Sequence, residues 1–126
     1  MGHVTWLRAS YWVGVVADAV ATISLLIPSR TGETEFRYSM GVAAALMFGW
    51  TVLLIWGDRK PVERRGILLL TAFPVIPALL AAAIYAGMVD QLPPGQVVFR
   101  AIAMILIEAL MLFSYVRAER AVRRAA

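Results

Sequence analysis

The chain has 126 residues, enough for a single domain, and 61% of them are hydrophobic, with a mean hydropathy of +0.76. This composition excludes a water-soluble fold of this size, because a soluble domain must cover its surface with polar groups. The absence of cysteine excludes disulfides and thiolate metal sites, and the single histidine, His3, lies outside the apolar runs, which excludes haem ligation by paired histidines in a membrane.

Four apolar segments are each long enough to cross a bilayer, which takes about 20 residues of helix. In chain order, we expect helices over residues 11–28, 39–57, 67–88 and 97–116, followed by a basic tail over residues 117–126. The connections are short, so successive helices should pack antiparallel. The sequence therefore predicts an all-α integral membrane protein: a single domain, 1–126, built as an antiparallel bundle of four transmembrane helices.

The basic residues predict the orientation of these helices. Nine of the twelve lysines and arginines fall on the side of the membrane that holds both termini and the 58–65 connection, against three on the other side. Lysine and arginine are enriched on the cytoplasmic side of membrane proteins. We therefore expect a multi-pass protein of the cell (inner) membrane, with both termini in the cytoplasm. The formal net charge of +4 is explained by the helix ends, so we do not expect nucleic-acid binding.

Two acidic residues stand out because they fall in the middle of predicted helices. Asp18 lies in the first helix and Glu108 in the fourth, at similar depth although the helices run in opposite directions. A carboxylate at mid-membrane costs at least about 2.5–3.5 kcal/mol, so it normally faces the protein interior. The first and fourth helices of a four-helix bundle are usually neighbours, so we expect both carboxyls to point inward, lie close together and share a proton.

The same region offers three polar neighbours for these acids. Helical spacing places Tyr11 and Thr22 on the stripe of Asp18, and Trp50 lies at mid-membrane in the second helix. Together with Asp18 and Glu108 they form the predicted intramembrane polar site. The site has a functional and a structural interpretation. In the first it is a relay for protons or cations, or a ligand pocket. In the second, Asp18 and Glu108 are a hydrogen-bonded pair that sets helix register.

Small residues and prolines mark the two middle helices. Gly41, Ala45 and Gly49 form one ridge of small residues at four-residue spacing, and the alanines at positions 78, 82 and 86 form another. Such ridges allow close helix approach, either within the chain or between copies of it. Pro74 and Pro77 each remove a backbone hydrogen bond from the third helix and predict a local distortion there.

The basic residues at the predicted membrane surface are expected to contact lipid headgroups or an acidic partner. They are Arg59, Lys60, Arg64 and Arg65 in the second connection, and Arg117, Arg120 and Arg124 on one face of the tail. We predict neither a metal site nor a cofactor. The expected partners are the lipid bilayer and either a second copy of the chain or another membrane protein.

Three functions agree with this pattern. The first is a non-enzymatic membrane subunit or scaffold that acts in a homo-oligomer or a larger complex, and it best explains the small-residue ridges and short loops. The second is a small transporter coupled to protons or cations through Asp18 and Glu108. The third, an intramembrane acid–base enzyme such as an isomerase, has the fewest candidate residues, so we predict no catalytic residue and no enzyme.

Overall fold

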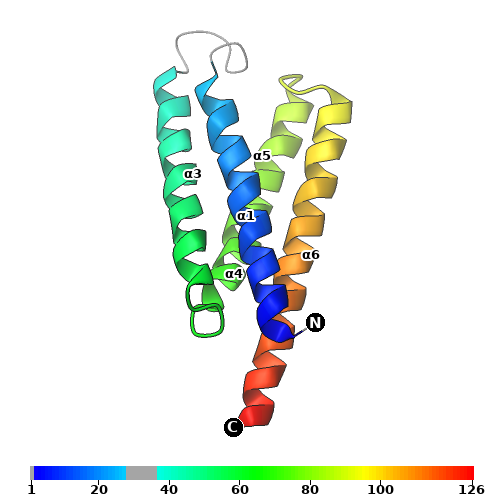
Figure 1. Cartoon of the computed structure of the whole chain (residues 1–126). Helices are drawn as coiled ribbons and strands as arrows, with labels where there is room; N and C mark the ends of the chain where they lie inside the picture. The colour runs from blue at the N-terminus through cyan, green and yellow to red at the C-terminus, as the bar shows by residue number, and fades with distance from the viewer. Residues whose placement is uncertain (1, 28–36) are drawn as a thin grey trace.

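Helices make up nearly all of residues 2–27 and 37–126, which are the residues that the computed structural model describes (Figure 1). Four helices in this part of the chain are long and apolar enough to cross a membrane, and they pack as a bundle. This confirms the predicted all-α membrane fold. The elements are α1 (His3–Leu26), α3 (Arg37–Asp58), α4 (Gly66–Leu70), η2 (Thr71–Val75), α5 (Ile76–Met88) and α6 (Pro94–Ala125). The three consecutive elements α4, η2 and α5 together form the third membrane-length helix, Gly66–Met88.

Two helices extend beyond the segments predicted from hydropathy. α1 begins at His3 rather than at residue 11, because the polar residues of its first two turns are compatible with a helix that starts outside the hydrocarbon. The first helix was predicted to end at Pro28, which lies outside the described residues. α6 has 32 residues, or about 48 Å of helix, whereas the hydrocarbon core is about 30 Å thick. Figure 1 accordingly shows the C-terminal part of α6 projecting past the other helices.

The helices run antiparallel in sequence order (Figure 1). The start of α1, the connection between α3 and α4, and the end of α6 lie at one end of the bundle, called here the terminal end. The turn at residues 89–93 lies at the other, called the far end. α1 packs against α3 and α6, and α6 packs against α4 and α5, so the first and fourth membrane-length helices are neighbours as predicted.

The apolar core of the bundle lies toward the terminal end. It is built from buried side chains of every membrane-length helix: Leu7, Tyr11, Val15, Leu54, Leu68, Ala72, Ile76, Met111 and Ala118. In the far half of α1 and α6, large apolar side chains such as Ile23 and Phe99 are exposed instead. Because the surface between the helix ends is apolar, lipid is its natural solvent.

Candidate functional site

Asp18 lies on the inward stripe of α1, where the sequence placed it. One turn before it, Gly14 is buried, and one turn after it, Thr22 is nearly so, while Asp18 itself is half-buried. Its carboxyl oxygen Oδ2 is buried, and no hydrogen-bond partner among the described residues reaches it. A buried polar atom without a partner is unusual in a native structure. A proton, an ion or a polar ligand at this position would satisfy Oδ2 of Asp18.

Glu108 lies at a depth close to that of Asp18. A methyl group added at Gly14 would stand 2.9 Å from Met111 Cε, so α1 and α6 meet at these two residues. Asp18 is one turn from Gly14 toward the far end, and Glu108 is one turn from Met111 in the same direction, because the helices are antiparallel. These steps are about 6 Å and about 4.5 Å along the helix axes, respectively. Glu108 is half-buried at the edge of the α6 face that packs on the core. The shared proton stays a prediction.

The three polar residues predicted to accompany the acids donate their hydrogen bonds elsewhere. Tyr11 Oη donates to the carbonyl oxygen of Arg64 at 2.8 Å. Thr22 Oγ1 donates to the backbone carbonyl of Asp18, one turn back in its own helix, at 2.8 Å. Trp50 Nε1 donates to Thr71 Oγ1 at 3.1 Å. In the described part of the chain, none of these three side chains donates its hydrogen bond to either carboxyl, and Thr22 bonds to the backbone of Asp18 instead. Their place in a common polar site stays a prediction.

Trp50 instead forms its hydrogen bond at the first residue of the helix distortion that contains Pro74. Because proline has no N–H, the helix widens into the π-helical turn η2, and the N–H of Ile76 bonds to the Thr71 carbonyl. The Thr71 hydroxyl donates to the Ile67 carbonyl at 2.8 Å and accepts the bond from Trp50. This links α3 to the third membrane-length helix. The predicted distortion is present, and the Thr71 hydroxyl within it accepts its hydrogen bond from Trp50 of the same chain.

The connection at residues 58–65 is held to the helices at the terminal end by Arg64. Its guanidinium carbon lies 3.3 Å from the ring centroid of Trp56, and its Nη1 donates to the Trp56 carbonyl at 2.5 Å. Its own carbonyl accepts the bond from the fully buried Tyr11. A cation over an aromatic ring contributes about 0.5–1 kcal/mol at an exposed site. Arg64 therefore has an intramolecular role that the sequence did not predict.

Arg65 joins the same connection to α6 through Glu119. Its Nε and Nη2 both lie 2.9 Å from Glu119 Oε2, and Arg123 Nε lies 3.1 Å from Oε1 of the same carboxylate. Glu119 follows the apolar stretch of α6 and lies in its charged extension. Hydrogen bonds from Arg65 and Arg123 lower the pKa of Glu119 below its usual value of 4.5, because they favour the charged form. These three residues are called the Glu119 clamp.

A third tie involves Asp58, the last residue of α3. Trp12 Nε1 of α1 donates to Asp58 Oδ2 at 3.3 Å, and Arg8 Nε lies 3.9 Å from Oδ1. The remaining cations predicted to contact lipid are exposed, and Lys60 forms a surface pair with Glu63 at 3.1 Å. The exposed set consists of Arg59, Lys60, Arg117, Arg120 and Arg124.

Sequence reasoning missed two buried serines that join α1 to α6. Ser10 Oγ donates to Ser114 Oγ at 2.6 Å, and both side chains are fully buried. Ser114 was available as a small polar residue inside the predicted fourth helix, but Ser10 lies just before the predicted start of the first helix at residue 11, so the sequence offered no signal for the pair.

The described residues hold no group of three or more histidine, cysteine or acidic side chains arranged to bind a metal ion. The geometry thus presents an acid without a partner at mid-depth and a tightly tied basic end. No protein-family model, no curated protein and no solved structure matches this chain.

Proposed function

We propose that this protein is a non-enzymatic membrane subunit that acts in a homo-oligomer or in a larger membrane complex. The observation that supports this function best is the direction of the α3 ridge. Gly41, Ala45 and Gly49 are all exposed, and a methyl group added at either glycine would meet nothing within 4 Å. The ridge is therefore not used for packing between the described helices and is open to contact with another chain in the membrane.

The close contacts inside the bundle use other glycines. A methyl group at Gly57 would stand 2.6 Å from the Tyr11 ring, and one at Gly87 would stand 2.7 Å from Val97. The contrast matters because close approach is the physical advantage of a small residue in a membrane helix. In α3 the small residues of the ridge face outward, away from the other described helices. On the third membrane-length helix, the alanines at positions 78 and 82 are exposed in the same way.

Large side chains border the α3 ridge and give it the shape of a shallow track. Leu46 and Phe48 are 71% and 62% exposed. A second helix that lies along the small residues would pack against these flanking side chains and gain van der Waals contacts that lipid tails make less well.

Replacing Gly49 with leucine tests this function. Because the position faces open space within the chain, the substitution should leave the fold intact and act on association alone. The matched control is Ala109→Leu, at an exposed small residue of α6 outside both ridges. The chain has no cysteine, so one cysteine added at Ala126 permits specific labelling, and energy transfer between labelled copies in liposomes measures association.

We expect Gly49→Leu to weaken association at least about tenfold, which corresponds to 1.4 kcal/mol, and Ala109→Leu to change it less than about twofold. Monomers at every protein-to-lipid ratio, or equal effects of the two substitutions, contradict self-association through α3. A complex with a different membrane protein would then have to use this ridge, and crosslinking from a photoreactive residue at Gly49 in cell membranes would identify it.

A second candidate function is a small transporter coupled to protons or cations. The partnerless Oδ2 of Asp18 supports it, because a buried carboxyl without a donor is suited to bind a proton or cation. The single bundle presents its tight core on the terminal side of Asp18, so a path through the membrane would need more than one copy of the chain.

We further propose that the protein lies in the cell (inner) membrane with its terminal end in the cytoplasm. Nine of the twelve basic residues lie at that end by the helix order, and they include both the 58–65 connection and the tail. This is the charge distribution expected of cytoplasmic loops.

A further inference from the structure

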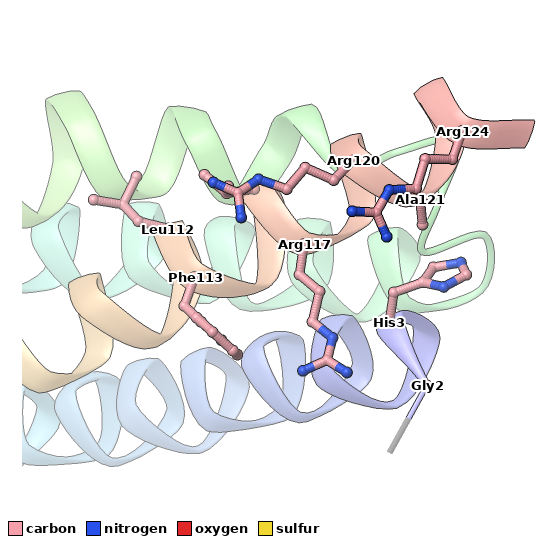
Figure 2. Close-up of a pocket in the computed structure, with 9 residues that line it drawn as sticks. Gly2, His3, Leu112, Phe113, Arg117, Arg120, Ala121 and Arg124 are labelled. Atoms are coloured by element: carbon pink, nitrogen blue, oxygen red, sulfur yellow. The ribbon is translucent and has the colours of Figure 1, made fainter. Parts of the chain in front are cut away.

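A groove runs between the first turn of α1 and the C-terminal third of α6, at the terminal end (Figure 2). Its volume is about 760 Å³. Gly2 and His3 line one side, and α6 lines the other with Leu112, Phe113, Val116, Arg117, Arg120, Ala121 and Arg124. Neither the intramembrane acids nor the outward ridge of α3 belongs to it, so the groove is independent of the proposed function.

The charged part of the groove is basic. Figure 2 shows the side chains of Arg117, Arg120 and Arg124 around it, with Arg117 extending from α6 toward α1. As far as the structure describes the lining, no acidic side chain belongs to it. The nearest acid along the helix, Glu119, is bound on both carboxylate oxygens by Arg65 and Arg123. Within the Glu119 clamp, this carboxylate is already bound by two arginines that do not line the groove.

The other part of the groove is apolar. Leu112, Phe113 and Val116 line it, and the Arg117 guanidinium carbon lies 6.0 Å from the Phe113 ring centroid, where the two parts meet. From Leu112 to Arg124 the lining covers about 18 Å along α6. The change from apolar to basic lining occurs where the apolar stretch of α6 ends, which is where a bilayer passes from hydrocarbon to headgroups.

We propose that this groove is a binding site for an anionic phospholipid of the leaflet at the terminal end. The phosphate lies among Arg117, Arg120 and Arg124, because planar guanidinium groups bind phosphate oxygens through paired hydrogen bonds. The upper part of an acyl chain lies on Phe113 and Val116. An acidic peptide would satisfy the arginines but not the apolar half, and the groove lies at the depth where phospholipids are already present.

The test measures binding of short-chain phosphatidylglycerol, below its micelle concentration, to the purified full chain in neutral detergent. The groove variant is Arg117→Gln, Arg120→Gln and Arg124→Gln together. The charge-matched control replaces Arg8, Arg59 and Lys60 by glutamine, three basic residues of the same end that belong neither to the groove nor to the Glu119 clamp. If the triple groove variant cannot be purified, Arg120→Gln alone replaces it, with Arg59→Gln as its control.

We expect saturable binding that is at least about tenfold tighter than that of phosphatidylcholine of the same chain length. The groove variant should lose roughly 10- to 100-fold in affinity, and the control less than about threefold. Val116→Ser should weaken phosphatidylglycerol binding and leave the binding of inorganic phosphate unchanged, which separates an amphiphile site from a simple anion site.

Four results would each overturn the proposal. They are equal affinity for the two lipids, equal losses in the groove variant and its control, competition by inorganic phosphate at the same concentration as the lipid, and tighter binding of hexaglutamate than of phosphatidylglycerol. The third result would indicate a site for free anions, and the fourth a site for an acidic protein segment.

Discussion

Ser10 and Ser114 form a hydroxyl chain across the interface of α1 and α6. Ser10 Oγ donates to Ser114 Oγ at 2.6 Å, and Ser114 Oγ in turn donates to the Trp6 carbonyl at 3.1 Å. The same interface contains the edge-on contact of Trp6 with Phe113, whose ring centroids are 5.2 Å apart. The first and last helices are thus joined by a polar contact inside an apolar core, on the terminal side of the two acids.

Ser114→Ala should lower the free energy of unfolding by about 1 kcal/mol, because hydrogen bonds between membrane helices contribute about that much. Titration with a denaturing detergent, followed by circular dichroism, measures this. Thr51→Val is the control, since the Thr51 hydroxyl bonds only to the Met47 carbonyl of its own helix. Equal losses for the two variants would contradict a specific role of the serine pair.

Gly57→Ala should destabilise the fold by about 1–3 kcal/mol, the usual cost of overpacking. The added methyl group would stand 2.6 Å from the ring of Tyr11, which is fully buried and tied to Arg64. Gly66→Ala, where the methyl group meets nothing within 4 Å and which lies outside the α3 ridge, is the control and should not destabilise. The same denaturing-detergent titration measures both variants. If Gly57→Ala leaves the free energy of unfolding unchanged, the Tyr11 ring moves aside freely and the prediction is wrong.

Replacing both Asp18 and Glu108 by their amides separates a structural pair from a transport site. For a structural pair, the double variant should fold, with a change in unfolding free energy of less than about 1 kcal/mol, because amides still form hydrogen bonds. Liposomes loaded with a pH-sensitive dye should then show no proton flux for either protein. Flux in the unmodified protein that disappears in the double variant, and persists in the exposed-site control Asp90→Asn, would instead establish the transporter.

The Glu119 clamp predicts a dependence of stability on pH. The pKa of Glu119 is lowered in the folded protein, so its contribution is present above the usual value of 4.5 and is lost as the pH falls through the lowered value. The unmodified protein should therefore be more stable than Glu119→Gln at neutral pH, and this difference should vanish in acid. Glu63→Gln, at an exposed surface pair, is the control. A difference that does not depend on pH would contradict the clamp.

Reporter fusions test the orientation. A reporter at the C-terminus should indicate the cytoplasm, and one inserted in the turn at residues 89–93 should indicate the opposite side, because the basic residues gather at the terminal end. Opposite signals from both fusions would reverse the assignment while leaving the bundle unchanged.

The number and order of the helices follow from the sequence alone. A chain in lipid must satisfy its backbone hydrogen bonds within each span, so every long apolar run becomes a helix, and short connections make neighbours antiparallel. The similar depth of Asp18 and Glu108 also follows from the sequence, because each lies near the middle of its apolar run. Hydropathy did not detect the first two turns of α1, because it reports where the hydrocarbon lies and not where the helix begins.

For α3 and α5, the tertiary structure alone decided which face points inward. The small-residue spacing drew attention to Gly41 and Gly49, which face outward, whereas Gly57 and Gly87 are packed because other segments bring Tyr11 and Val97 against them. The inward role of Arg64 likewise depends on Trp56 and Tyr11. A water-soluble helix shows its buried face by a polar opposite face, but a helix in lipid is apolar all round. Its rotation is therefore set by packing against its neighbours, and the sequence indicates it only where a rare polar residue such as Asp18 marks the inward face.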